Sequence, residues 1–323
     1  MRLKLGSTSV TGGSGVSERL SPSRIATYVT CPRQFEFHYE HSLETADKDE
    51  MERYFNRGTV LDTALQKTAN KISPETDIEA VRSLAREQFE EEWTEQTAVR
   101  DYPSPASYEY DRRISKAAVE DYLDPDTDGD GLEHLRRSLG TEVHLEWKDT
   151  DWGPIHGYAD NIVETRDGLL IIDYKASFSG RSFPNKSGSD VQKQVSGTKH
   201  YPRRLKKWLQ LGLYWEGLKE HDFYTVGDEI RFMFYGLIES KTREPTSGGY
   251  TVDVSGKAWD MTDLYRSQSE VFDRLITTGV DGIRGRDFDP TDHRWDLIQS
   301  EACEECDYRA ACGDYLAEEV QFS

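Results

Sequence analysis

The chain has 323 residues, of which 31% are charged, and its formal net charge is −20. This balance excludes a generally basic nucleic-acid binder, although a local group of basic residues can still contact phosphate. No run approaches the roughly eighteen apolar residues that span a bilayer, and the first twenty residues lack the apolar segment of a signal peptide. We therefore expect a cytoplasmic protein without membrane partners.

The acidic composition has two interpretations. Arg outnumbers Lys 25 to 15, and Asp and Glu together number 60. This pattern is typical of halophilic proteins, in which an acidic surface is an adaptation of solvation to high salt. The alternative is an acidic surface that evolved to bind one particular partner.

The N-terminal segment, residues 1–20, is rich in Gly and Ser, and we expect it to be flexible. Ser21-Pro22-Ser23 then supplies an N-cap followed by a proline in the first turn. This pattern predicts a helix that runs through Ile25 and Tyr28 and on past Cys31.

Two helices are predicted next, because residues 58–70 and 77–97 carry apolar side chains at helical spacing. The segment 98–140 that follows is polar and helical only in part. We interpret residues from about 70 to about 140 as a helical insertion within a single domain that spans residues 21–323.

Short alternating or β-branched runs begin at Thr141 and are separated by Gly and Asp turns. They predict four strands, over residues 142–149, 156–165, 168–177 and 229–240. Two further helices are predicted over 203–220 and 258–278. Strands bracketed by helices indicate a mixed α/β domain, and we place its catalytic core at about 141–240.

The four cysteines form an unusual pattern. Cys303, Cys306 and Cys312 follow a C-x2-C-x5-C spacing near the C-terminus, whereas Cys31 lies near the N-terminus. Two disulfides would stabilise a chain of this length poorly, so four thiolates around one metal centre are the better interpretation. Zinc and an iron–sulfur cluster both suit such ligands. Either centre would join the two ends of the chain in a reducing compartment.

A predicted hairpin brings acidic and basic side chains together. Asp173 and Lys175 point to the same face of their strand, and Tyr174 points to the other. If the connecting loop has an even number of residues, Asp160 lies opposite Asp173 or Lys175 and shares that face. Two carboxylates and an amine are costly to bury, and carboxylates suit Mg²⁺ or Mn²⁺. The alternative is a buried salt bridge at the edge of a sheet.

Asp160 followed by Asp173-Tyr174-Lys175 resembles motifs II and III of the PD-(D/E)XK nuclease superfamily, in the D-Y-K form of its RecB-like exonuclease branch. The resemblance implies a restriction-endonuclease-like mixed central sheet flanked by helices. It also implies that Asp160 and Asp173 ligate Mg²⁺ or Mn²⁺ together with the Tyr174 backbone carbonyl. Lys175 would then serve the attacking water.

Three further matches in the same order strengthen the resemblance. Ser21-Pro-Ser-Arg-Ile and Cys31-Pro-Arg-Gln-Phe resemble the N-terminal cysteine motif of the branch, and Gln210-x3-Tyr214 resembles its Q-x3-Y motif. Gln210 and Tyr214 are thereby expected beside the site or the DNA strand. In AddB-like and CRISPR-associated members, the corresponding cysteines hold a [4Fe–4S] cluster and clasp the two ends. The ligands implied here are Cys31, Cys303, Cys306 and Cys312.

One position departs from the family pattern. The branch usually carries G-x-x-x-H, with the His ligating metal, whereas this chain has Gly58-Thr59-Val60-Leu61-Asp62. An Asp can replace His as an oxygen ligand for Mg²⁺ or Mn²⁺, so Asp62 is a predicted metal ligand. The alternative is an Asp62 exposed to solvent on its helix.

A basic segment, residues 186–207, separates the D-Y-K strand from the Gln210 helix. Its cations are predicted to contact DNA, and Tyr201 and Trp208 are predicted to stack on unpaired bases. The alternative is a solvated helix face. The cations of the segment are Lys186, Lys193, Lys199, His200, Arg203, Arg204, Lys206 and Lys207.

The sequence therefore predicts a metal-dependent deoxyribonuclease. Exonuclease action on single-stranded or end-opened DNA, in recombination, repair or CRISPR adaptation, is what the resemblance implies. No G-x4-G-K-[ST] motif is present, so an unwinding helicase would be a separate chain, as would CRISPR adaptation proteins. The alternative is a catalytically weak DNA-binding subunit of a larger complex.

Overall fold

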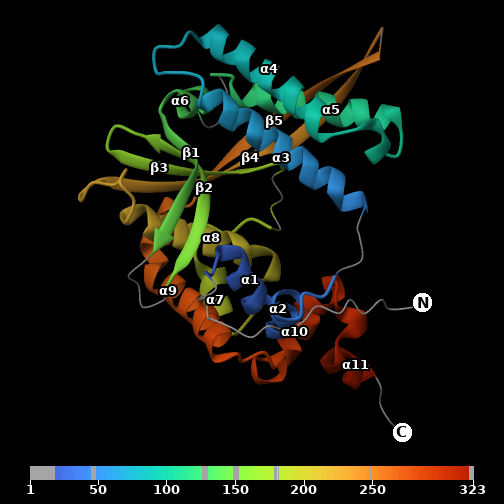
Figure 1. The fold of residues 1–323 in the computed structure, drawn as a ribbon, viewed down its shortest axis with the longest axis vertical. Helices are drawn as coiled ribbons and strands as arrows, with labels where there is room; N and C mark the ends of the chain where they lie inside the picture. The colour runs from blue at the N-terminus through green and yellow to red at the C-terminus, as the bar shows by residue number, and fades with distance from the viewer. Residues whose placement is uncertain are drawn as a thin grey trace, which may run out of the picture.

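A mixed five-stranded sheet, ordered β1-β2-β3-β4-β5, organises the protein (Figure 1). The computed structural model describes residues 19–44, 49–125, 130–147, 153–177, 180, 182–247 and 249–319, and it describes no side chain for residues 49–55 and 318–319. The strands are β1 (Ser138–Trp147), β2 (Ile155–Glu164), β3 (Gly168–Lys175), β4 (Glu229–Thr246) and β5 (Gly249–Asp260). Neighbouring strands are antiparallel except β3 and β4, which are parallel.

Helices cover both faces of the sheet, as Figure 1 shows. One core is formed by sheet residues with α1 (Pro22–Thr30), α8 (Pro202–Lys219) and α9 (Thr262–Gly285). The opposite core is formed with α3 (Asp49–Ala69), α4 (Ile78–Gln96) and α5 (Pro105–Tyr122). The predicted mixed sheet flanked by helices is therefore confirmed. The parallel β3–β4 pair requires a long crossover, which α7 (Ser189–Ser196) and α8 provide.

Strand β3 is buried on both of its faces. Leu169 and Ile171 pack into the core beside α8, whereas Leu170, Ile172 and Tyr174 pack into the core beside α3. A central strand with two buried faces has a nearly continuous apolar sequence. Asp173 interrupts this run, although its side chain is completely buried.

The predicted helix that runs past Cys31 is wrong at its C-terminal end. Helix α1 starts as predicted, with the Ser21 hydroxyl accepting from the Arg24 amide at 3.3 Å and Pro22 in the first turn. It ends at Thr30, and Cys31 is extended before α2 (Pro32–Phe35) begins. The cause is Pro32, which lacks an amide proton and disfavours helical backbone in the residue before it.

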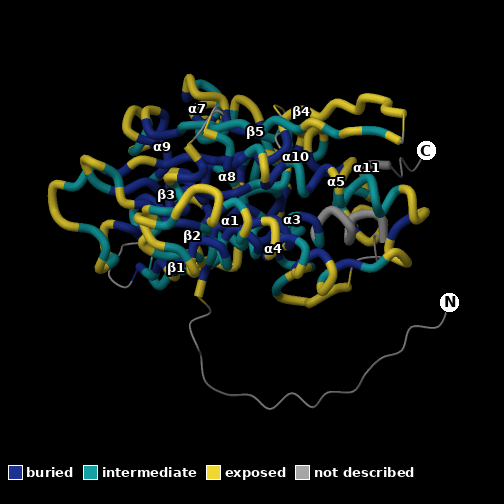
Figure 2. Tube along the Cα trace, turned by 90° about the horizontal axis from the view of Figure 1, so that it is seen from above, coloured by how far each residue is buried: buried dark blue, intermediate teal, exposed yellow. Residues whose placement is uncertain are grey.

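The last two predicted elements also change. The strand predicted over 229–240 extends to Thr246, and residues 249–260 form β5, which was not predicted. The helix predicted over 258–278 begins only at Thr262 and continues to Gly285, because residues 258–260 pair with β4. Helix α5 covers the outer part of this hairpin, where the Gly256 amide donates to Asp121 Oδ2 at 2.7 Å. Figure 2 shows the exposed tip of the hairpin at one end of the molecule.

The two ends of the described chain meet. Helices α10 (Trp295–Ala302) and α11 (Gly313–Glu319) lie beside α2 in Figure 1. Arg33 Nε donates to Asp314 Oδ2 at 2.7 Å, and His38 Nδ1 lies 2.8 Å from the Tyr308 hydroxyl. These contacts join the region around Cys31 to the C-terminal cysteine segment. Short helical turns complete the fold at Glu36–Glu40, Val99–Asp101, Gly131–Arg136 (α6), Pro290–Asp292, Cys303–Glu305 and Arg309–Ala311.

The predicted flexible segment, residues 1–20, lies outside the described residues up to residue 18. Leu20 is buried and its carbonyl accepts from the His156 amide at 2.8 Å. Among the described residues, no helix combines the length and the apolar character needed to cross a membrane.

Candidate active site

Three of the predicted catalytic side chains are in direct contact. Lys175 forms an ion pair with Asp173, since both side chains leave β3 on the same face. Gln210 Nε2, on α8, donates to Asp173 Oδ1 at 2.9 Å. The buried carboxylate of Asp173 is thus held between a cation from its own strand and an amide from the crossover helix.

Asp160 lies where the hairpin analysis expects it. The β2–β3 ladder pairs Glu164 with Leu169 and Asn161 with Ile172, so the loop is even and the next step in register sets Asp160 opposite Asp173. The backbone amide of Tyr174 donates to Asp160 Oδ2 at 2.6 Å. The amide between Asp173 and Lys175 therefore fixes the orientation of Asp160.

Tyr214 lies one helical turn after Gln210, and its hydroxyl accepts from Gln210 Nε2 at 3.4 Å. Its ring packs on Gly157 of β2, where an added Cβ would lie 2.6 Å from the Tyr214 ring. Gly157 is therefore required for this close approach. Gln210 Nε2 thus contacts both Tyr214 and Asp173.

Asp62 belongs to the same site. Asp62, Glu142 and Asp160 each offer a carboxylate oxygen, and these oxygens lie within 4.8 Å of one another; we call the three residues the carboxylate triad. Gln66, one turn after Asp62 on α3, donates to Asp62 Oδ2 at 2.8 Å and to Glu142 Oε1 at 3.0 Å. A single amide thus holds two of the three carboxylates side by side.

Glu142 is the site residue that the sequence analysis missed. It lies on β1 between Thr141, which pairs with Asn161, and Val143, which pairs with Ala159, so it is in register with Asp160. The pairing of β1 with β2 brings Glu142 to the site. The spacing of residues within a sequence motif does not predict that pairing. Its φ of 50° lies in the left-handed region, which is strained for a residue with a Cβ.

Burial and mutual repulsion raise the pKa values of two carboxyl groups in this site. Burial, and then the charges of Glu142 and Asp173, raise the pKa of Asp62 to about 7 against the opposing Gln66 hydrogen bond. Burial and the neighbouring Asp173 and Asp62 raise the pKa of Asp160 well above its usual value. Burial opposes the charge on Lys175, but Asp173 and Asp160 outweigh burial and raise its pKa.

The donor set fits a hard divalent cation. Asp62 Oδ1 is buried and accepts no hydrogen bond from any described residue, although a buried carboxylate oxygen normally has a partner. It belongs to a triad of oxygen ligands with Asp173 nearby, which suits Mg²⁺ or Mn²⁺ better than softer metals. A cation here would satisfy the orphaned oxygen and offset the repulsion between the carboxylates.

The four cysteines line one cavity, together with Phe37, Trp295, Tyr308 and Tyr315. Cys31, Cys303 and Cys312 are buried, and Cys306 is half-buried. Burial, and then the neighbouring Cys306 and Cys303, raise the pKa of Cys31 to about 12, against the opposing backbone amides of Gln34 and Arg33. The remote cysteine and the C-terminal cluster therefore line the same cavity.

Much of the basic segment is neutralised within the protein. Arg203 pairs with Glu305, and Arg204 and Lys193 pair with Asp190. His200 is buried, and its Nε2 lies 3.0 Å from the Thr30 carbonyl oxygen. These cations therefore form internal ion pairs and hydrogen bonds.

The prediction that Tyr201 and Trp208 stack on bases is wrong for Trp208. Its side chain is buried in the core beside α8, with the Tyr201 ring packed edge-on at a centroid distance of 5.8 Å. The Tyr201 hydroxyl donates to Asp190 Oδ1 at 3.0 Å. Trp208 has no free face, because α8 turns that side toward the sheet.

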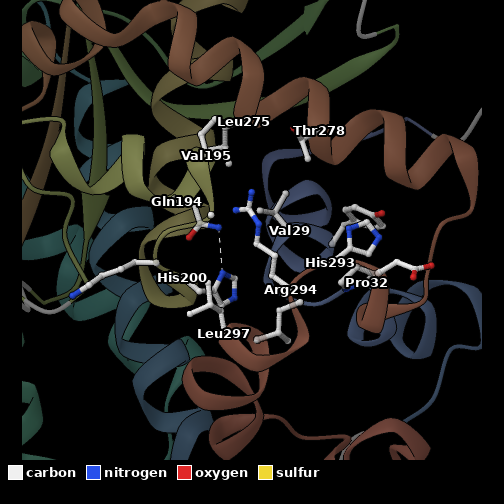
Figure 3. Close-up of a pocket in the computed structure, with 15 residues that line it drawn as sticks. Val29, Pro32, Gln194, Val195, His200, Leu275, Thr278, His293, Arg294 and Leu297 are labelled. Carbon is white, nitrogen blue, oxygen red and sulfur yellow. Dashed lines mark hydrogen bonds between the residues drawn. The ribbon is translucent and has the colours of Figure 1, made fainter.

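One cavity lies apart from these carboxylates. It has a volume of about 380 Å³ and lies among α1, α7, α9 and α10 (Figure 3). Figure 3 shows Arg294 reaching into it and the hydrogen bond between Gln194 and His200 at its side. Lys199 also lines it, but none of the predicted catalytic residues does. The reactive groups lie instead at the end of the β2–β3 ladder.

Comparison with known proteins agrees with this geometry. The family profile described as the PD-(D/E)XK nuclease superfamily matches residues 19–313. A search of curated proteins found no significant match. The profile match includes the carboxylate triad, the Asp173–Lys175 pair, Gln210 and all four cysteines.

Proposed function

The chain belongs to the PD-(D/E)XK nuclease superfamily, and on this premise we propose that it is an Mg²⁺- or Mn²⁺-dependent deoxyribonuclease, a RecB-like exonuclease acting on single-stranded or end-opened DNA. The observation that carries the proposal is the carboxylate triad placed beside the Asp173–Lys175 pair. Oxygen ligands next to a buried lysine are the groups that phosphodiester hydrolysis requires.

The carboxylates, the lysine and the two α8 side chains have different roles in this function. Asp62, Glu142, Asp160 and Asp173 would hold the metal, and a bound metal would supply Lewis-acid chemistry and lower the pKa of a water molecule. Lys175 remains protonated, because Asp173 and Asp160 raise its pKa. It therefore orients the attacking water and stabilises negative charge that develops on the phosphate. Gln210 and Tyr214 keep Asp173 in place.

The four cysteines are proposed to hold a [4Fe–4S] cluster with a structural role. The support for one shared centre is that all four cysteines line a single cavity, where the neighbouring Cys306 and Cys303 act electrostatically on Cys31. Cysteine thiolates are the ligands of such clusters, and the C-x2-C-x5-C spacing with one remote cysteine is what the family resemblance associates with a cluster.

The biological setting is proposed to be recombination, repair or CRISPR adaptation. DNA unwinding would come from a separate helicase, since the chain has no G-x4-G-K-[ST] motif. CRISPR adaptation proteins are the alternative partners. The acidic surface favours activity at high salt.

One assay tests the enzyme directly. End-labelled single- and double-stranded DNA is incubated at high salt with Mg²⁺ or Mn²⁺ and with wild-type protein, Lys175→Ala or Lys219→Ala. Lys219 lies on the exposed end of α8 in an ion pair with Glu216 and serves as the matched control. We expect the wild type and Lys219→Ala to degrade DNA and Lys175→Ala to be at least ~100-fold slower. Full degradation by Lys175→Ala would refute the catalytic assignment, and binding without degradation by the wild type would favour a DNA-binding subunit.

A further inference from the structure

The cations of the basic segment differ in their contacts. Arg203, Arg204 and Lys193 form ion pairs with carboxylates. Lys186 lies over the Trp259 ring, 4.6 Å from its centroid. Within the described residues, no carboxylate lies within ion-pair distance of Lys206 or Lys207. In a chain of net charge −20, two adjacent lysines without an acidic partner are conspicuous.

Lys206 is located by its place on α8. It precedes Gln210 by one helical turn, so both side chains leave the same face of the helix. Gln210 Nε2 contacts Asp173 on that face. The Lys206 side chain therefore extends along the helix surface that borders the catalytic carboxylates.

Lys207 is located by two aromatic rings. Its Nζ lies 4.8 Å from the centroid of Phe183, which packs edge-on against Phe234 at 5.8 Å. Phe234 is paired with Asp173 in the β3–β4 ladder, and Lys175 Nζ lies 5.8 Å from its ring centroid. The Phe183 and Phe234 rings thus link Lys207 to Lys175 through successive contacts.

The charges around these lysines are unbalanced. Burial, and then the positive charge of Lys175, lower the pKa of Lys206 and lower that of Lys207 to about 8, although Asp173 acts in the opposite direction. Lys207 is half-buried, and a partly desolvated ammonium group is unfavourable unless an anion compensates it. Lys206 is exposed, so its ammonium group is accessible to an external anion.

We propose that Lys206 and Lys207 bind backbone phosphates of the DNA strand on either side of the bond that is cut. This inference rests on the proposed nuclease function and identifies where the strand lies across the site. Successive helix residues project about 100° apart, so the two ammonium groups diverge and reach different phosphates. Lysine offers a flexible point charge, so this contact positions the strand without reading its sequence.

The test measures how binding depends on salt. A labelled single-stranded oligonucleotide is titrated by fluorescence anisotropy with Ca²⁺ in place of Mg²⁺, and a gel verifies that it stays intact. The variants are Lys206→Gln, Lys207→Gln and the double substitution. Lys193→Gln is the matched control, because Lys193 already pairs with Asp190.

Each single substitution should weaken binding by about tenfold and make the slope of log K against log salt less negative by about 0.7. The double variant should make the slope less negative by about 1.4. Lys206→Arg keeps the positive charge and should therefore keep the wild-type slope. Lys193→Gln should keep the wild-type slope. Unchanged slopes in Gln variants that melt at the wild-type temperature would overturn the proposal. If the wild type binds DNA with this lysine dependence but never cuts it, the phosphate site stands and the nuclease proposal fails.

Discussion

The amide of Gln210 and the carboxylate of Asp173 are joined by a hydrogen bond of 2.9 Å that links the crossover helix to the central strand. Both side chains are buried, so water cannot replace either partner. The contact connects α8, part of the crossover between the parallel strands β3 and β4, to β3 itself. The position of α8 therefore determines the orientation of the Asp173 carboxylate.

Replacing Gln210 by Ala should reduce both activity and stability. Asp173 Oδ1 would lose its amide donor within the core, which costs about 1–3 kcal/mol. We expect a lower melting temperature and at least a ~10-fold lower kcat with little change in KM. Tyr214→Phe is the matched variant, because it removes only the long 3.4 Å contact to Gln210. Equal losses in Gln210→Ala and Tyr214→Phe would contradict this assignment.

Replacing Asp62 by His should change which metal supports activity. Asp62→His replaces a hard carboxylate by an imidazole, which suits Mn²⁺ better than Mg²⁺. We expect this variant to retain activity with Mn²⁺ and to lose most of it with Mg²⁺, whereas Asp62→Ala loses activity with both. Parallel cleavage assays in the two metals measure the ratio. Wild-type activity in Asp62→Ala would show that Asp62 is not a ligand.

The metal-free protein should become less stable as the pH rises through 7. The pKa of Asp62 is about 7 in the folded state, and that of an unfolded Asp is about 3.9. A raised carboxyl pKa contributes stability that is fully present below about 3.9 and is lost as the pH rises through about 7. Asp160, whose pKa is also raised, acts in the same direction.

The measurement is the free energy of unfolding against pH, once with a chelator and once with Mg²⁺. Since the metal binds the deprotonated carboxylates, its stabilising effect should grow between about pH 5 and about pH 8. Asp62→Asn should flatten the chelator curve. If Mg²⁺ stabilised the wild type by the same free energy at every pH, this explanation would be refuted.

Replacing one cysteine should destabilise the protein, because the link between its N-terminal and C-terminal regions would be lost. A link between Cys31 and the C-terminal cluster closes a loop of about 270 residues, which by loop-closure entropy contributes roughly 5–6 kcal/mol. Cys31→Ser purified without oxygen should lose the brown colour and the bound iron and should melt at a lower temperature. A colourless wild type that contains zinc would instead identify the centre as a zinc site.

The sequence predicted the hairpin geometry because strand alternation and an even loop determine which side chains share a face. Asp160, Asp173 and Lys175 could therefore be placed without the fold. Glu142 could not, since it reaches the site only through the pairing of β1 with β2 and through Gln66 on α3. Such contacts depend on how separate elements pack.

The errors in the prediction have local physical causes. Strand β5 contains Ser255, Gly256 and Lys257, which weaken its alternation, so pairing with β4 determines its structure more than its own sequence does. The sequence did not distinguish the paired cations of the basic segment from the others. Their ion pairs depend on Asp190 on α7 and on Glu305 near the C-terminus. Trp208 was misread because a helix carrying many lysines can still bury one of its faces.

The shared cavity of the four cysteines also affects the order of events during synthesis. Cys31 is translated about 270 residues before Cys303, which at a general rate of 5–20 residues per second corresponds to roughly 14–54 s. The α1–α2 region must therefore wait on the ribosome without its final partners. A chain that is cut short before Cys303 can hold the catalytic carboxylates and still lack three of the four thiolates. The cavity lined by the four cysteines can therefore form only after residues 303–312 have been made.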